Sequence, residues 1–289
     1  MSNQICFYHG PKCSDGLVAA WAVWRHLNQD VRLIAMDYPD ELPAIPQNKV
    51  VWLVDFTFRD IDFMRELVSH NVKVIHYDHH PSAEQTIKEL QEIFPEERYH
   101  AVFTQTHSGA GITWRELFPD QELPNLVRWV EDWDLWRFNY AETYAFVEAF
   151  SNLDRTVEAC EFANTPEHQV RMVNMGEALV RKRLERCQQQ IDNETTYITL
   201  DLPDGERKSI PFSKLVEVHD ASEQTNLMIK KGMGPIVGGY FLMGNRIKVR
   251  IGTAPDTPSA FKIAQHYGGG GHPHAAGFVI EASELPGLF

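Results

Sequence analysis

The chain has 289 residues, of which 43% are hydrophobic and 23% charged, which excludes intrinsic disorder and allows a sizeable core. Its formal net charge of −13 argues against a protein that binds long nucleic acid through a basic face, and favours a small anionic substrate bound through a cation. The sequence has no apolar run of ~18 residues and no signal-peptide pattern, so we expect a cytoplasmic protein without a membrane partner.

The first 140 residues alternate short apolar runs with helical patterns. Strands are expected at residues 5–8, 31–36, 50–54, 72–77 and 99–103, and helices at 16–27, 61–69 and 112–117. Strands that alternate with helices are typical of a mainly parallel sheet with helices on both faces.

The rest of the chain changes character twice. Residues 165–194 have the apolar spacing of one long helix, and β-rich runs separated by turns follow at residues 197–200, 235–242 and 246–251. The expected fold class is therefore α/β: an N-terminal, mainly parallel sheet flanked by helices, a helical linker, and a smaller C-terminal α/β domain. We place the three segments at 1–155, 156–194 and 195–289.

Polar residues follow several of the expected strands where each strand ends. His9 follows the first strand, Asp55 the third and Asp78-His79-His80 the fourth. Since ligands of such sheets bind beyond the carboxyl ends of the strands, these side chains predict a site there. A buried strand-end carboxylate such as Asp55 is costly unless it is paired or coordinated, although strand ends also reach solvent.

The loop after the first strand carries His9, Cys13 and Asp15, three residues of metal-ligand type. The alternative interpretation is that Ser14 or Asp15 only caps the next helix. The four cysteines are scattered without a CxxC pair, so they are expected to be reduced thiols.

The Asp78-His79-His80 triplet is the most specific polar signal in the chain. Because neighbouring side chains point in different directions, one can bind metal, one can orient a ligand and one can meet substrate. Solvated polar residues in a turn are the structural alternative.

Two further segments contain candidate binding residues, an acidic pair and a glycine-rich run. Asp132 and Asp134 follow a helical, aromatic-rich stretch; one can point into the site while the other caps or faces solvent. Gly268 to Gly271, followed by His272, let backbone N–H groups approach an anion closely, whereas a flexible linker is the alternative.

Together these motifs resemble the DHH phosphoesterase superfamily, specifically its members with the glycine-rich DHH-associated C-terminal domain. Asp78-His79-His80 is similar to the family signature, and Gly269-Gly270-Gly271-His272 to the substrate motif of the C-terminal domain. The first family motif, His-x3-Asp-x-Asp, departs here, because Cys13 stands where an aspartate is usual.

The resemblance implies two divalent cations, with Mn²⁺ as the expected metal. It implies that the first ion is held by His9, Cys13 and Asp55. The second ion would be held by Asp15, Asp55, His79 and Asp132. Asp134 is the alternative to Asp132 in this second set. A thiolate at Cys13 is softer than a carboxylate and would favour Fe²⁺, Co²⁺ or Zn²⁺ at that position. The alternative is that Cys13 stands aside and the first metal site is weak.

The resemblance also implies roles in catalysis and substrate binding. Asp55 would bridge the metals and His80 would face the scissile phosphate, while Asp78 orients its neighbours. Gly269, Gly270, Gly271 and His272 would bind the rest of the substrate.

The expected activity is hydrolysis of short linear oligonucleotides or dinucleotides to mononucleotides. The alternatives are a 3′-phosphoadenosine 5′-phosphate phosphatase and a catalytically weak nucleotide-binding sensor, which the Cys13 substitution would favour. The oligomeric state stays open, with a homodimer among the options.

Overall fold

The computed structural model describes residues 2–37, 41–215, 220–281 and 283. The chain divides into two compact units, Met1–Val180 and Arg181–Phe289. The predicted segment boundaries at 155/156 and 194/195 remain predictions, and the predicted end of the last segment, residue 289, lies outside the described residues. None of the described helices is both long enough and apolar enough to cross a membrane.

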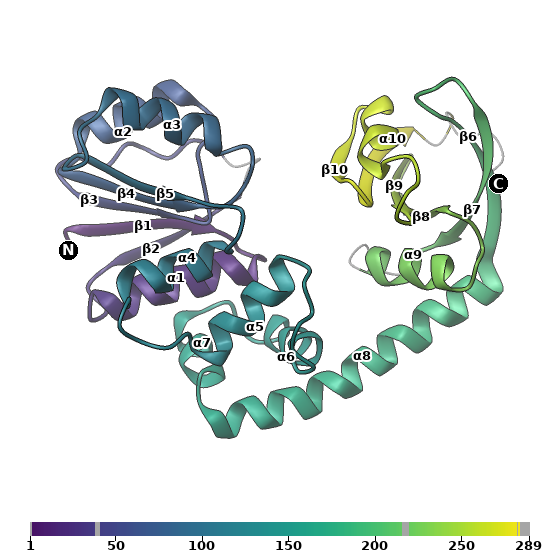
Figure 1. Cartoon of the computed structure of the whole chain (residues 1–289), viewed down its shortest axis with the longest axis horizontal. Coiled ribbons are helices and arrows are strands. Elements are labelled where there is room, and N and C mark those ends of the chain that lie inside the picture. Colours follow the sequence, from purple (N-terminus) through teal and green to yellow (C-terminus); the bar gives the residue numbers. More distant parts are fainter. Residues whose placement is uncertain (1, 38–40, 216–219, 282, 284–289) are drawn as a thin grey trace. The chain divides into compact units, whose positions relative to one another are not determined.

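The first unit is built on a five-stranded parallel sheet with the order β2-β1-β3-β4-β5 (Figure 1). Its strands are β1 (Gln4–His9), β2 (Arg32–Met36), β3 (Val50–Val54), β4 (Lys73–Asp78) and β5 (Tyr99–Phe103). This sheet confirms the predicted fold class. β2 and β3 lie on opposite sides of β1, so the strand order reverses there, as in folds that bind ligands at that point.

Strand register brings the predicted polar residues to one edge of the sheet. Tyr8 pairs with Val54, and Val54 pairs with Tyr77. The residues that follow these three along the chain are His9, Asp55 and Asp78, so they lie side by side where neighbouring strands end.

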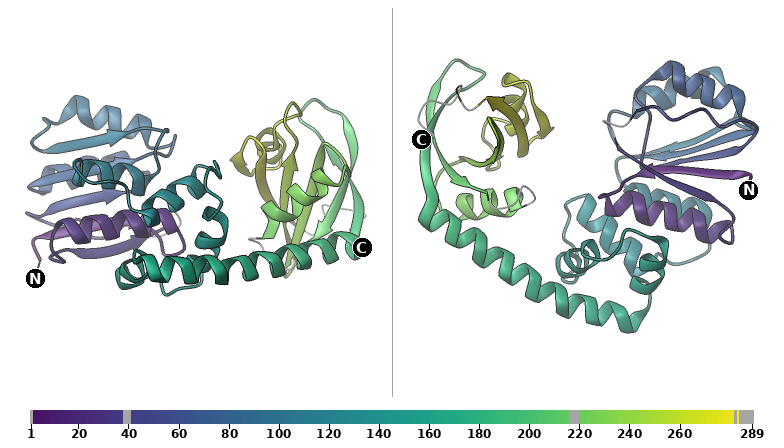
Figure 2. Two further views of the ribbon diagram at one scale, coloured as in Figure 1. Left: turned by 60° about the horizontal axis from the view of Figure 1, so that its bottom comes forward. Right: turned by 180° about the vertical axis from the view of Figure 1, so that it is seen from behind.

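Side chains of the sheet alternate between two apolar layers, because successive strand residues point to opposite faces. Cys6 and Trp52 belong to the layer of α1 (Ser14–His26), α4 (Gly109–Leu117) and α5 (Asn125–Asp134). Phe7 and Leu53 belong to the layer of α2 (Ile61–His70) and α3 (Glu84–Ile93). Both faces of the sheet are thus covered, which explains why its strands are continuous apolar runs (Figure 2).

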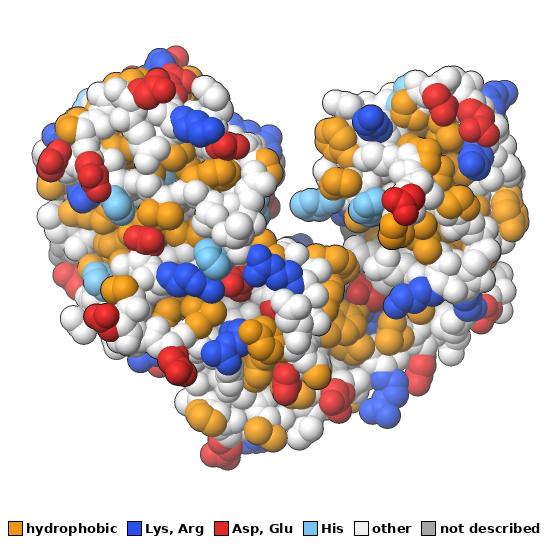
Figure 3. Space-filling model, viewed as in Figure 1, with side chains coloured by type: hydrophobic (Ala, Val, Ile, Leu, Met, Phe, Trp, Pro, Cys, Tyr) orange, Lys and Arg blue, Asp and Glu red, His pale blue; other side chains and the backbone are white. Residues whose placement is uncertain are grey.

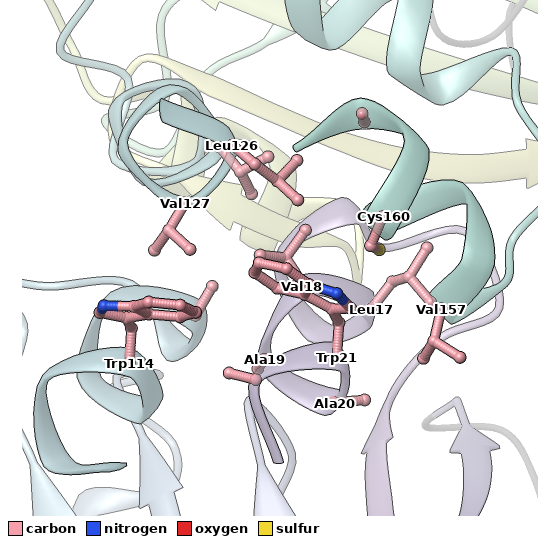
Figure 4. Close-up of a cluster of buried hydrophobic side chains, with 14 of the residues drawn as sticks. Leu17, Val18, Ala19, Ala20, Trp21, Trp114, Leu126, Val127, Val157 and Cys160 are labelled. Atoms are coloured by element: carbon pink, nitrogen blue, oxygen red, sulfur yellow. The ribbon is translucent and has the colours of Figure 1, made fainter. Parts of the chain in front are cut away.

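The core beneath the sheet centres on α1, which is apolar on every side and buried from Asp15 to Val23. The Trp21 ring stacks on Trp114 of α4 with centroids 5.5 Å apart, among the side chains drawn in Figure 4. The buried indole Nε1 of Trp21 donates to Glu161 Oε1 at 2.8 Å. This packing holds α1, whose first turn carries Asp15, against α4 and α7 (Val157–Ala163).

The first unit ends in helices. These are α6 (Thr143–Ser151), α7 (Val157–Ala163) and α8 (Pro166–Glu194), whose 29 residues run past the division between the units. Gly176 of α8 lies against α6 so closely that a Cβ there would be 1.7 Å from the Ala145 carbonyl oxygen.

The second unit contains a six-stranded mixed sheet with the order β10-β11-β9-β8-β7-β6. Its elements are β6 (Thr195–Asp201), β7 (Arg207–Lys214), α9 (Ala221–Lys230), β8 (Ile236–Met243), β9 (Arg246–Thr253), α10 (Ala260–His266), β10 (Gly270–His272) and β11 (Ala275–Glu281). Only β7 and β8 pair in parallel among the described strands of this sheet. Apolar side chains of the sheet pack against Ile263 and Ala264 of α10.

Candidate metal centre

Asp55 lies at the middle of the predicted site and is 1% exposed. Its Oδ2 is 3.5 Å from His9 Nδ1 and 3.4 Å from Cys13 Sγ. Its Oδ1 is 3.1 Å from His79 Nε2 and 3.7 Å from His80 Nδ1. One carboxylate therefore contacts side chains that come from two strand ends and from the first loop.

The backbone around Asp55 is specialised for this position. Asp55 has a φ of +56°, in the left-handed region that aspartate tolerates better than most residues and that recurs at functional sites. A Cβ at Gly109 would lie 2.4 Å from Asp55 Cβ, so only glycine lets α4 begin beside this carboxylate. Likewise, a Cβ at Gly16 would lie 2.0 Å from the His9 carbonyl oxygen.

Asp15 supplies a second buried carboxylate, which is 1% exposed. Its Oδ1 accepts hydrogen bonds from Ser108 Oγ at 2.6 Å and Ala110 N at 3.1 Å. Its Oδ2 is buried, no described residue donates a hydrogen bond to it, and it lies 3.9 Å from His79 Nε2. A buried carboxylate oxygen without a donor is costly unless a cation satisfies it, so this residue fits a metal ligand.

Asp134, rather than Asp132, completes the cluster. Asp134 Oδ2 is 3.4 Å from His79 Nε2. Asp132 is 3% exposed and its carboxylate accepts hydrogen bonds from Asn139 N, Tyr140 N and Thr143 Oγ1. Both residues lie on α5, but Asp132 turns toward the next loop and Asp134 toward the cluster, so the geometry favours Asp134 over the predicted Asp132 as a ligand.

The cluster forms two neighbouring sets of donor atoms. Within each set the atoms lie within 4.8 Å of one another. The sets are His9, Asp55 and His80, and Asp15, His79 and Asp134. Cys13 lies beside the first set through its contact with Asp55.

Mutual proximity shifts the pKa values of the cluster. Burial raises the pKa of Asp55, but hydrogen bonds from His79 and His9 outweigh it and lower the value to about 2. Burial lowers the pKa of His79, but its hydrogen bond to Asp55 and nearby carboxylates raise the value to about 10. Burial, and next the charge of Asp55, raise the pKa of Asp134 to about 6 and that of Asp15 well above its usual range. Without an added cation, protons therefore neutralise part of the cluster.

Cys13 is the N-cap of α1, where its Sγ accepts a hydrogen bond from Gly16 N. Burial, and next the charges of Asp55 and Asp15, raise the pKa of its thiol well above the usual range. The thiol accordingly donates to Asp55 Oδ2. Only a cation in contact with the sulfur would stabilise the thiolate here.

Asp78 is fully buried and orients the triplet from behind. Its Oδ1 accepts hydrogen bonds from the backbone N–H groups of His79 and His80 and from His80 Nδ1 at 2.8 Å. Its Oδ2 accepts one from Thr57 Oγ1 at 2.5 Å. His80 is thus held by backbone and side chain at once.

A row of hydrogen-bonded, buried polar side chains continues beyond Asp78, and no motif in the sequence predicts it. Thr57 Oγ1 lies 2.8 Å from His76 Nε2, and His76 Nδ1 lies 2.7 Å from the Tyr99 hydroxyl. His76 is fully buried. A histidine inside the otherwise apolar run of β4 was the available signal.

In the second unit, the glycine-rich motif is partly a strand rather than a loop. A Cβ at Gly269 would lie 2.2 Å from the Gly277 carbonyl oxygen, and one at Gly271 would lie 2.6 Å from Ala276 Cα. These glycines therefore allow β11 to approach closely. His272 at the end of β10 is exposed, and Figure 3 shows histidine side chains at the surface of this unit.

Arg250 is a further candidate residue of this region, although it belongs to no motif in the sequence. It is opposite Gly277 in the β9–β11 register, and a Cβ on Gly277 would lie 2.9 Å from Arg250 Cδ. Its Nε is buried without a hydrogen-bond partner among the described residues, and burial lowers its pKa. This leaves a cationic donor beside the glycine motif.

Comparison with known protein families agrees with this architecture. Residues 7–127 match the family described as the DHH family, N-terminal domain. The first unit contains a DHH-family domain. Members of the DHH family are metal-dependent phosphoesterases, so the chain is an enzyme of this class that depends on divalent metal.

Similar proteins share the fold over most of the chain. A pGpG-specific phosphodiesterase of Vibrio cholerae is 13% identical, with a TM-score of 0.53 over 97% of this chain and 94% of its own. RecJ of Thermus thermophilus, solved with Mn²⁺, is 18% identical, with a TM-score of 0.56 over 98% of this chain and 50% of its own. An uncharacterised protein of Acanthamoeba polyphaga mimivirus is 22% identical over 96% of this chain and 67% of its own length. At these identities the solved structures show the DHH fold and not a substrate.

Proposed function

We propose that this DHH-family protein hydrolyses short linear nucleotides, such as dinucleotides, to mononucleotides with two divalent cations. The observation that carries the proposal is the position of Asp55, whose two oxygens contact donors of both sets. A carboxylate in that position suits a bridging ligand. When bound, two such cations acidify a water and neutralise charge on the phosphate.

The donor types support Mn²⁺, because carboxylate and imidazole groups suit this metal. We propose His9, Cys13 and Asp55 as ligands of one ion, and Asp15, Asp55, His79 and Asp134 as ligands of the other. Asp134 replaces Asp132 in the second set, since the carboxylate of Asp132 is engaged with the following loop.

His80 is the candidate for contact with the scissile phosphate. Burial lowers the pKa of His80, but its hydrogen bond to Asp78 outweighs this and raises it. Because Nδ1 donates to Asp78, Nε2 of the imidazolium becomes the second donor. A hydrogen bond from Nε2 would stabilise charge on a phosphate oxygen or help the leaving oxygen depart.

Groups of the second unit support binding of a nucleotide phosphate. Gly270, Gly271 and the exposed His272 offer backbone and imidazole donors, and Arg250 adds a positive charge. We propose that these residues bind a terminal phosphate of the substrate. The likeness to a pGpG-specific phosphodiesterase along nearly the whole of both chains supports a short substrate.

The test is an assay of the full chain with Mn²⁺, repeated with Fe²⁺, Co²⁺ and Zn²⁺. The substrates are linear dinucleotides, longer oligonucleotides and a 3′,5′-bisphosphate. We expect release of mononucleotides, with the highest kcat/KM on dinucleotides. Preference for the 3′,5′-bisphosphate would replace it by a phosphatase, and tight nucleotide binding without turnover with any metal would replace it by a sensor.

A further inference from the structure

Four aromatic side chains gather around the loop between α5 and α6, two on the loop itself and one on each helix. The aromatic patch consists of Trp133, Trp136, Phe138 and Tyr144. Trp133 stacks on Tyr144 with centroids 5.1 Å apart and an interplanar angle of 14°. Trp136 and Phe138 meet edge to face at 4.7 Å, and both also contact Trp133.

Two members of this patch face water. Trp136 is 50% exposed and Phe138 is 39% exposed. Their φ angles are +56° and +52°, a left-handed conformation that bulky side chains rarely adopt. Such a conformation persists only where the surroundings enforce it, and it recurs at ligand-binding sites.

Asp132 enforces this loop conformation. Its carboxylate accepts hydrogen bonds from the backbone N–H groups of Asn139 and Tyr140, and its carbonyl oxygen accepts one from Arg137 N. A buried charge on α5 is therefore used to hold a loop whose aromatic side chains remain exposed. This contact gives the second aspartate of α5 a role outside metal binding.

The loop lies at the same edge of the sheet as the metal centre. Trp136 is two residues beyond Asp134, so their Cα atoms are at most about 7 Å apart. Arg137 Nη2 donates to the carbonyl oxygen of Thr106 at 2.6 Å, which ties the loop to the segment following β5. A base that is joined through one sugar to a phosphate at the centre spans a comparable distance.

We infer that Trp136 and Phe138 form a stacking site for a nucleobase of the substrate. This inference rests on the proposed function and adds the group that is recognised. Aromatic faces bind bases with little sequence preference, because every base presents a π-face. The occupant is a nucleobase rather than a protein, since the patch adjoins a phosphoester centre and is carried by a loop held in one conformation.

The test compares a linear dinucleotide with the same dinucleotide lacking one base, using Mn²⁺ and the full chain. Trp136→Ala and Phe138→Leu should raise KM for the intact dinucleotide by roughly 5- to 100-fold, the range measured when base–aromatic stacking is removed. On the abasic substrate KM should change by less than about twofold, and Trp136→Phe should restore most of the loss. The matched control is Phe162→Ala on α7, which removes an aromatic side chain that is 42% exposed.

Equal losses on both substrates, or none on either, would overturn the inference. A change in sedimentation mass of Trp136→Ala with an unchanged KM would also overturn it and identify a subunit interface. Binding of a phosphorothioate dinucleotide separates failure of the two proposals. If the wild type shows no turnover but binds the analogue more tightly than Trp136→Ala does, the proposed hydrolysis is refuted and the stacking site is supported. If the wild type hydrolyses the dinucleotide and Trp136→Ala changes neither turnover nor binding, hydrolysis is supported and the stacking site is refuted.

Discussion

His79 Nε2 lies 3.1 Å from Asp55 Oδ1 at the carboxyl edge of the parallel sheet, where Asp55 is buried and the His79 side chain is 12% exposed. In this arrangement a proton on His79 occupies the space between donor atoms that a cation would take. The proton and the metal therefore compete for one pair of residues.

This competition predicts that metal affinity rises with pH. The pKa of His79, about 10, exceeds its ordinary 6.5, so His79 carries a proton at neutral pH that a bound cation must displace. Affinity for Mn²⁺ should rise about tenfold per pH unit for each displaced proton. Calorimetric titrations in buffers of different ionisation enthalpy count those protons, and a pH-independent affinity without proton release would contradict this view.

The same shifts predict that the metal-free protein is more stable in mild acid than at neutral pH. The pKa of Asp134 is about 6 in the folded state against an ordinary 3.8. The contribution of Asp134 to the free energy of unfolding is fully present below pH 3.8 and is lost as pH rises through about 6. The contribution of His79 has the same sign and is lost as pH rises through about 10. Thermal unfolding in chelator should show a falling Tm between about pH 4 and 6, which Asp134→Asn should flatten.

The two aspartates of α5 should separate stability from metal binding. Asp132→Ala leaves buried donors of the following loop unsatisfied and should lower the free energy of unfolding by about 2–3 kcal/mol, since its hydrogen bonds involve a charged acceptor. Asp134→Ala should instead lower metal affinity and raise the metal-free Tm at neutral pH, because it removes a carboxylate whose ionisation destabilises the metal-free protein. Denaturant titrations with and without Mn²⁺ distinguish them; the opposite pattern would restore Asp132 as the ligand.

Cys13 should determine metal preference. Its Sγ lies 3.4 Å from Asp55 Oδ2, close enough to share a cation with that carboxylate. Cys13→Asp should increase activity with Mn²⁺ relative to Co²⁺, because it exchanges a soft donor for a hard one. A thiolate-to-Co²⁺ charge-transfer band in the wild type, lost in Cys13→Ser, reports coordination directly; its absence from the wild type means that Cys13 only caps α1.

The parallel sheet could be predicted because its strands are buried on both faces and are therefore continuous apolar runs, such as 50–54. β7 was missed because Pro211 and Ser213 interrupt its apolar pattern. β10 is not predicted because glycines disfavour strands, and only the close approach of β11 explains Gly269 and Gly271.

The site could be predicted where a residue of metal-ligand type lies at or just after the end of an apolar strand, as for Asp55 and His79. The choice between Asp132 and Asp134 was not, because two residues on a helix point to nearly opposite sides and the sequence does not set the rotation of α5. The roles of Thr57 and Arg250 depend on contacts between distant segments, which no local pattern records.

If Asp55 joins two metal sites, replacing it should change the metal content of the purified protein. The measurement is the number of Mn²⁺ ions bound per chain, with kcat/KM on a linear dinucleotide, for wild type, Asp55→Asn and the control His100→Ala. We predict two ions in the wild type and the control. In Asp55→Asn we predict loss of at least one ion and a fall in kcat/KM of more than ~100-fold, beyond the usual cost of altering a residue that only supports a ligand. Two ions and near-normal activity in Asp55→Asn would mean that Asp55 does not join two metal sites.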